Sequence, residues 1–204
     1  IMKLLGIIIL AILIIFFIFQ LYSINSNKSI EKYPYSLIKK YNGFETRIYE
    51  SRLFSMVKLP GDKYENISGQ GFSALAGYIF GGNEKKQRIS MTSPVTMALE
   101  DSITMMFMVP EKYNRENLPH PNNSDIKFIQ EPEKKVAVIR FGGWANSEKI
   151  EAHKAALLQL LEKENITHSG NFYFLGYNPP HEVLSRRNEI IVELETNSLK
   201  DKDK

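Results

Sequence analysis

The sequence predicts an α+β fold, in which a distorted antiparallel β-barrel of about eight or nine strands is flanked by two helices and preceded by a transmembrane helix. Short apolar segments bounded by turn residues predict the strands, and two longer segments with helical spacing predict the helices. The order strand-strand-helix-strand-strand occurs twice with a shift of about 82 residues, so that FSMVKLPG aligns with VAVIRFGG. Such a duplication predicts two pseudo-two-fold halves, although common elements can also align by coincidence.

Composition excludes several classes of protein. The chain has 204 residues, of which 43% are hydrophobic and 24% charged, which is enough for one domain with a substantial core. The absence of cysteine excludes disulfides, thiolate metal sites and a cysteine nucleophile. A net charge of +3 without a block of basic residues argues against nucleic-acid binding.

The N-terminal segment LLGIIILAILIIFFIF contains sixteen uncharged residues and predicts a membrane anchor within residues 1–24. A cleaved signal peptide would end in small residues, whereas this run ends in QLYSIN, a poor cleavage site. A buried core helix is the alternative, but it would need a polar face that the run lacks.

Two features of the sequence give opposite indications of the side of the membrane on which the folded domain lies. Lys28 and Lys32 after the span outnumber Lys3 before it, which favours a cytoplasmic domain. An uncleaved signal-type run after so short a tail favours export instead. We expect a single-pass membrane protein with an exported domain.

After the anchor we expect a polar linker at residues 25–32, a folded domain at 33–195 and a charged tail at 196–204. In the first half, the expected elements are a hairpin at Asn42-Gly43, a strand at Leu53–Leu59, a helix at Asn66–Phe80 and strands at Pro94–Leu99 and Ile103–Val109. In the second half, they are strands at Ile126–Gln130 and Lys135–Phe141, a helix from Asn146 or Ser147 to Glu164, and strands at Phe172–Tyr177 and Glu189–Leu194.

The first helix carries one candidate binding surface. Phe72, Ala76 and Phe80 are spaced four residues apart, near one helix face, and could form an apolar wall for a planar molecule. The helix also contains three glycines, each unfavourable by ~0.5–1 kcal/mol relative to alanine, which suggests close approach of another backbone or of a flat ligand. Ordinary packing of the helix on the sheet is the alternative.

The stretch GYNPPHEVLSRRNEIIVEL carries the second candidate surface. Its two prolines cannot lie inside a central strand, so a stiff loop presents His181, Arg186 and Arg187 where the last strand begins. Such a loop could hold an anionic, partly apolar molecule. Alternatively, RRNE could form an internal ion-pair cluster with Glu189 that orders the loop.

No pattern predicts catalysis or a defined metal site. The sequence lacks G-x-S-x-G, a phosphate loop and a dinucleotide fingerprint. None of the four histidines has metal-ligand spacing, so any metal ligand stays unknown. Five methionines between residues 91 and 108 are typical of an adaptable core, and a thioether ligand to iron is an unspecific alternative.

Several segments together resemble the SOUL haem-binding protein family. They are GFETRIYES, FSALAGYIFGGNEKKQRISMTSPVTM, MMFMVP, FGGWA and FYFLGYNPPHEVLSRRNEIIVEL, which follow the family's order from Tyr35 to Leu194. The resemblance implies a distorted barrel of two similar halves with two helices. It also implies binding of haem or another tetrapyrrole in an apolar cleft between Gly69–Phe80 and Pro179–Arg187, and kinship with small-molecule-binding domains of bacterial transcription regulators.

The sequence departs from the family at several polar positions. The family histidine proposed as a haem ligand corresponds to Ile48, and basic residues of other members correspond to Gly69, Gly77 and Glu182. If haem binds here, His181, Arg186 or Arg187 would have to replace those contacts, or binding would be mainly apolar.

The overall expectation is a membrane-anchored, non-catalytic binding protein for a tetrapyrrole or another planar apolar small molecule. The alternatives are a small-molecule hydrolase on the same barrel, and a binding module for another apolar metabolite or a protein partner.

Overall fold

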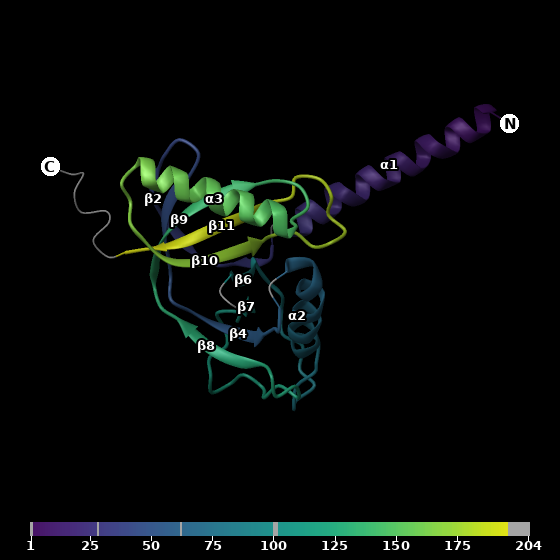
Figure 1. Ribbon diagram of the computed structural model, residues 1–204. Helices are drawn as coiled ribbons and strands as arrows, with labels where there is room; N and C mark the ends of the chain where they lie inside the picture. The colour runs from purple at the N-terminus through teal and green to yellow at the C-terminus, as the bar shows by residue number, and fades with distance from the viewer. Residues whose placement is uncertain (1, 28, 62, 100–101, 196–204) are drawn as a thin grey trace.

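The computed structural model describes residues 2–27, 29–61, 63–99 and 102–195, and the expected charged tail at 196–204 lies outside these residues. It contains a strongly curled nine-stranded sheet, two helices packed on that sheet, and a long N-terminal helix that projects away from the body (Figure 1). The elements are α1 (Met2–Asn27), β1 (Glu31–Lys32), β2 (Tyr35–Lys40), β3 (Glu45–Tyr49), β4 (Arg52–Lys58), α2 (Tyr64–Ile79), β5 (Thr92–Ser93), β6 (Val95–Leu99), β7 (Ile103–Met108), β8 (Lys127–Glu131), β9 (Lys134–Phe141), α3 (Ser147–Lys163), β10 (His168–Gly176) and β11 (Asn188–Leu194).

The order of the strands confirms the predicted pseudo-two-fold fold. The large sheet runs β2-β3-β9-β11-β10-β6-β7-β4-β8. If β3, β4, β6 and β7 of the first half are exchanged with β8, β9, β10 and β11 of the second, the order from β3 to β8 reads the same in reverse. The antiparallel pair β6–β10 therefore lies at the centre of the two-fold relation. The two helices follow the same two-fold relation. Helix α2 contacts β4 and β7, and α3 contacts their counterparts β9 and β11.

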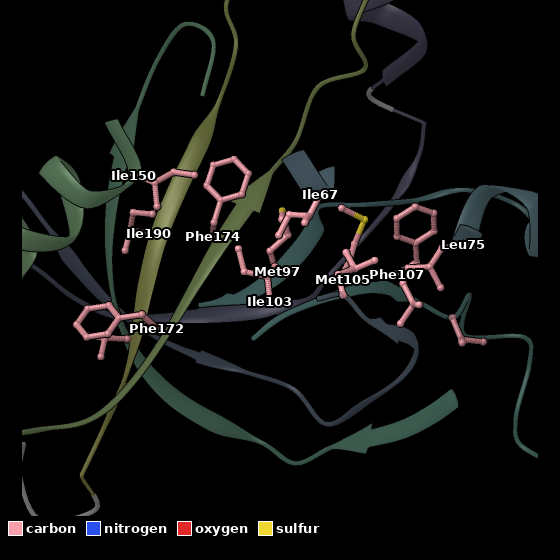
Figure 2. Close-up of a cluster of buried hydrophobic side chains, with 14 of the residues drawn as sticks. Ile67, Leu75, Met97, Ile103, Met105, Phe107, Ile150, Phe172, Phe174 and Ile190 are labelled. Carbon is pink, nitrogen blue, oxygen red and sulfur yellow. The ribbon is translucent and has the colours of Figure 1, made fainter. Parts of the chain in front are cut away.

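The sheet is buried on both faces, which explains the nearly continuous apolar runs of its central strands. One cluster lies between the sheet and the two helices and includes Leu75, Met105, Leu157 and Phe174, part of which Figure 2 shows. The other cluster lies on the opposite, inner face of the curled sheet. Neighbouring residues of β7 and β10 alternate between the two clusters, as the period of two in a strand requires.

Local sequence signals explain the turns and caps. Gly43 adopts φ +96° in the predicted hairpin between β2 and β3, a conformation that favours glycine. Asn146 caps α3 as expected, and its Oδ1 accepts a hydrogen bond from the Lys149 amide at 2.9 Å. The first packed helix begins at Tyr64, two residues before its expected start at Asn66.

The N-terminal helix is longer than expected. It continues to Asn27, past the expected limit at residue 24, because no glycine or proline interrupts it there. Part of the expected linker is also ordered, since Glu31 and Lys32 form the short parallel strand β1 beside β5. Lys3–Ser26 is long and apolar enough to cross a membrane, a property that signal sequences share.

Candidate functional site

A cavity of about 600 Å³ lies on the face of the sheet that carries α2 and α3. This volume is within the ~300–1,000 Å³ typical of small-molecule and cofactor sites. Its floor comes from the two central strands, through Val95 and Met97 of β6 and Phe174 and Gly176 of β10. The cavity therefore lies over the centre of the pseudo-two-fold relation, in the space between the two halves.

The beginning of α2 forms one wall of the cavity. Tyr64, Ser68, Gly69, Phe72 and Ser73 line it. The Phe72 side chain is 37% exposed, and its ring meets the Phe107 ring edge-on at a centroid distance of 5.4 Å. An aromatic face is thus available to a ligand on this wall.

The beginnings of α2 and α3 are tied together beside the cavity. The Tyr64 amide donates to the Ser147 Oγ at 3.1 Å, and the Ser147 amide donates to the Glu65 carboxylate at 2.7 Å. Trp144 and Ala145, just before α3, also line the cavity. Two helix N-termini, each the positive end of a helix dipole, therefore lie at its edge.

The β10–β11 loop forms the opposite wall and places Arg186 in the cavity lining. The Arg186 Nη1 donates to the backbone oxygens of Pro179 at 3.0 Å and Glu182 at 2.7 Å. Its guanidinium carbon lies 4.0 Å from the centre of the Trp144 ring. Its Nε is buried without a hydrogen-bond partner. Its Nη2 donates to the Asn178 backbone oxygen at 3.3 Å. Partial burial lowers the pKa of the guanidinium, although the negative charge of the buried Glu182 acts in the opposite direction.

The C-terminal part of α1 completes the cavity. Phe19, Tyr22, Ser23 and Ser26 line it. Gln20 is 1% exposed, although it follows sixteen uncharged residues in a helix whose side chains from Lys3 to Phe19 are all exposed. Gln20 can be buried because its side-chain amide both donates a hydrogen bond to the β10–β11 loop and accepts one from it.

This Gln20 contact joins α1 to the cavity wall. The Gln20 Nε2 donates to the His181 backbone oxygen at 2.9 Å, and the Val183 amide donates to the Gln20 Oε1 at 3.1 Å. The rings of Phe19 and His181 also pack together at a centroid distance of 5.7 Å. The apolar N-terminal helix therefore forms part of the cavity wall.

The second arginine of the loop has a different environment. Arg187 lies outside the cavity lining, and its Nε and Nη2 donate to the carboxylate of the completely buried Glu189 at 2.9 and 2.6 Å. Arg47 of β3 donates to the same carboxylate at 2.9 and 3.0 Å. The Tyr177 hydroxyl adds a further donor at 2.7 Å. For Arg187, the structure thus contains the internal ion-pair cluster that was the alternative interpretation of RRNE.

This cluster fixes the charge of Glu189. Desolvation alone would raise the pKa of the Glu189 carboxyl, but the hydrogen bonds and charge of Arg47 and the charge of Arg187 hold it below its ordinary value. Desolvation raises the pKa of Tyr177 well above its ordinary value, so the phenol stays protonated and donates to Glu189. The cluster holds the base of the loop at the start of β11.

The six residues proposed from sequence lie in two groups. Phe72, His181 and Arg186 line the cavity. The other three lie outside the lining, with Ala76 buried in the core, Phe80 61% exposed at the end of α2, and Arg187 in the ion-pair cluster. A spacing of four residues advances ~40° around a helix, so Phe72 and Phe80 diverge by ~80°. Ligand contact by any of the six stays a prediction.

The structure also places the positions at which the sequence departs from the SOUL pattern that it resembles. Ile48 lies on β3, outside the cavity lining, whereas Gly69 lines the cavity, and a side-chain carbon added there would meet no atom within 4 Å. Glu182 is buried and accepts a hydrogen bond from the Asn178 Nδ2 at 2.6 Å. The acidic residue at that position therefore helps to shape the loop.

The cavity lining carries positive charge without acidic side chains among its described residues. Among the described residues that line it, none is Asp, Glu or Lys, and Arg186 is the one guanidinium. No group of three His, Asp or Glu side chains within the described chain is arranged to hold a metal ion. The arrangement can bind an apolar molecule that carries an anionic group, and the potential axial iron ligands in the lining are His181, methionine sulfur and tyrosine oxygen.

Sequence reasoning missed the contributions of α1 and Trp144. Gln20 and Ser23 are two polar residues three positions apart, which places them on one face of the helix. Both are buried against the domain. That spacing was the signal that the end of the apolar run contacts the protein.

Comparison with known proteins identifies the family. The profile of the family described as "SOUL heme-binding protein" matches residues 30–193. The chain belongs to the SOUL haem-binding protein family. "Heme-binding protein 1" of Xenopus laevis is 28% identical over 155 residues, covering 72% of this chain and 81% of the relative. "Heme-binding protein 2" of Mus musculus is 27% identical over 168 residues, covering 78% and 82%.

Solved structures support the fold of this SOUL protein. The C-terminal domain of EcmrR has a TM-score of 0.58 at 10% identity, covering 79% of this chain and 98% of that domain. A hydrolase from Listeria innocua has a TM-score of 0.54 at 11% identity, covering 74% and 91%. At such low identity these similarities show a shared fold alone.

Proposed function

We propose that this SOUL protein is a membrane-anchored, non-catalytic binding protein for haem or another tetrapyrrole, which it holds in the 600 Å³ cavity. The observation that carries the proposal is an open apolar cavity with one guanidinium among its described lining residues, in a chain of a haem-binding family. Its own side chains leave the space free between α2 and the β10–β11 loop, where a flat macrocycle could lie.

The cavity lining fits the two chemical parts of such a ligand. The rings of Phe72 and Phe174 and the side chain of Met97 offer apolar surface, whose burial contributes ~25 cal/mol per Å². Arg186 would pair with a ligand carboxylate, because it lines the cavity and guanidinium groups bind carboxylates through charge-assisted hydrogen bonds. A bound tetrapyrrole would contribute a planar ring and, as haem, an iron ion.

The contacts of α1 support a retained anchor. Removal of the apolar segment as a signal peptide would leave the His181 oxygen and the Val183 amide without the partners that Gln20 provides. It would also remove Phe19, Tyr22 and Ser23 from the cavity wall. We therefore place the protein as a single-pass membrane protein, with its folded domain on the exported side.

The lining also supports binding without catalysis. It contains no carboxylate among its described residues, and burial raises the pKa of Tyr64 and Tyr177. Both phenols are therefore protonated donors at neutral pH and do not act as general bases.

The test is an absorbance titration of the full chain in detergent with hemin and with metal-free protoporphyrin. A saturable Soret shift for both ligands would indicate ring burial, and an additional change for hemin alone would indicate iron ligation. Trp144 is the one tryptophan of the sequence and lines the cavity, so its emission should fall with the same saturation curve. No saturable change with either ligand would refute the proposal.

Protoporphyrin dimethyl ester tests the role of Arg186. The ester lacks free carboxylates, so it should bind the wild-type protein more weakly than the acid by about 1.5–3 kcal/mol, the range of a charged hydrogen bond. In Arg186→Leu the two ligands should bind alike. Arg140→Leu, which removes an exposed arginine of β9 outside the lining, should keep the wild-type difference.

A further inference from the structure

The length of the apolar part of α1 indicates where the cavity would lie relative to a membrane. All side chains from Lys3 to Phe19 are exposed, so this part of the helix is free to contact lipid. Leu4 to Ser23 is a stretch of about 20 residues, or ~30 Å at 1.5 Å per residue. That length equals the ~30 Å hydrocarbon core of a bilayer.

Spanning the bilayer with this stretch places the cavity at the membrane surface. Phe19 would lie about 6 Å inside the hydrocarbon boundary and Ser26 about 5 Å outside it. Both residues line the cavity, and so do Tyr22 and Ser23 between them. The cavity wall therefore crosses the boundary between hydrocarbon and headgroups.

Other exposed apolar groups surround the same side. Trp144 is 52% exposed in the cavity lining, and Val183, 40% exposed, bonds through its amide to Gln20 of α1. Figure 1 shows the β10–β11 loop beside the end of α1, whereas β8 lies at the far end of the molecule. Tryptophan is enriched at the interface between membrane and water, and Trp144 is suitably placed for that role.

We infer that the cavity opens onto the membrane surface, with α1 as one of its walls, and that it takes its ligand from the bilayer rather than from water. The inference rests on the proposed function, because it requires the retained anchor. It names the ligand class more closely as an amphiphile that partitions into membranes, planar and apolar with an anionic edge. Its apolar part would move from lipid into the cavity while its carboxylate meets Arg186 at the headgroup level.

The first test measures the position of Trp144 and needs no ligand. The full chain is reconstituted in phosphatidylcholine vesicles that contain lipids brominated near the headgroup, and Trp144 emission is compared with that in unbrominated vesicles. Brominated lipid should remove most of the emission, while aqueous iodide should remove little. The matched control is Trp144→Phe combined with Ile129→Trp, which moves the tryptophan to an exposed position on β8 and should give the reverse pattern. Iodide quenching of Trp144 without lipid quenching would overturn the inference, even if haem binds.

The second test follows the route of the ligand. Vesicles that contain the full chain are loaded with hemin through the lipid, with excess apomyoglobin outside to capture hemin that enters the water. The Soret shift of the SOUL protein should develop at the same rate with and without the scavenger. Suppression by apomyoglobin would show entry through water and overturn the inference while the proposed function stands. Absence of a Soret shift both here and in detergent would refute the proposed ligand, and Trp144 quenching would then decide the position of the cavity alone.

Discussion

Three glycines of α2 lie in different surroundings, so alanine substitutions at the three positions should give three different results. A side-chain carbon at Gly69 or Gly77 would meet no atom within 4 Å. Gly69 lines the cavity and Gly77 does not. At Gly71 the same carbon would lie 2.6 Å from the Leu59 Cδ1 and 3.1 Å from the Met105 Sδ.

The expected changes in stability follow from these distances. Alanine is more favourable than glycine inside a helix by ~0.5–1 kcal/mol, so Gly69→Ala and Gly77→Ala should each stabilise the protein by that amount. For a domain of this size, 1 kcal/mol corresponds to a shift of about 2–4 °C in Tm. Overpacking at Gly71 costs about 1–3 kcal/mol, which exceeds the helical gain, so Gly71→Ala should destabilise by about 1 kcal/mol.

Ligand binding separates the two stabilising variants. A methyl group at position 69 would occupy space where the proposed ring lies, so Gly69→Ala should weaken protoporphyrin binding about tenfold, or ~1.4 kcal/mol. Gly77→Ala should bind as the wild type does. Thermal melting of the full chain in detergent and quenching of Trp144 by protoporphyrin measure both effects. Equal affinities for Gly69→Ala and Gly77→Ala would show that the ligand does not lie against this part of α2, and a stable Gly71→Ala would contradict the close packing of α2.

Three further predictions concern stability. Glu189→Gln leaves the buried Arg47 without its main counter-charge and should reduce the free energy of unfolding by about 3–5 kcal/mol, measured by urea denaturation against Glu133→Gln, an exposed control. Because the pKa values of Glu189 and Glu193 are lowered in the folded state, their stabilisation is present above the unfolded value of ~4.3 and should be lost as the pH falls through the folded values. The Glu189→Gln variant should therefore lose less of its free energy of unfolding on acidification than the wild type does. Gln20→Leu should accelerate hydrogen exchange at the Val183 amide, whereas Leu13→Ala, on the exposed part of α1, should not.

The order of helices and strands could be predicted in detail because the sequence signals for them are local and occur in both halves. Each half repeats the same strand and helix order, and turn residues such as Gly43 mark the boundaries. The sheet order could not be read in the same way. Pairing of β9 with β3 and β11 joins segments far apart in the chain, and no single segment specifies its partner. The palindromic order from β3 to β8 is a consequence of the duplication that only the structure displays.

The binding residues could be predicted only in part, because side-chain direction depends on tertiary partners. Arg186 and Arg187 are adjacent in sequence and carry the same charge. In the structure, Arg186 faces the cavity while Arg187 donates to the buried Glu189. The difference originates in Arg47, which comes from a distant strand and helps fix the Glu189 carboxylate as a charged acceptor. No feature of RRNE alone separates the two arginines.

The expected division of the chain into an anchor and a separate domain explains why the α1 wall of the cavity was not predicted. An apolar run normally ends where the membrane ends, so a glutamine after sixteen uncharged residues is easily taken as the exit point. In this chain Gln20 is 1% exposed, so its burial comes from protein and not from lipid. A polar amide placed near the hydrocarbon boundary needs hydrogen-bond partners, and the β10–β11 loop supplies an acceptor and a donor. The hydrogen bonds that satisfy Gln20 therefore also fix the loop that carries Arg186. In the proposed membrane arrangement, these bonds would couple the position of α1 in the bilayer to the shape of the cavity.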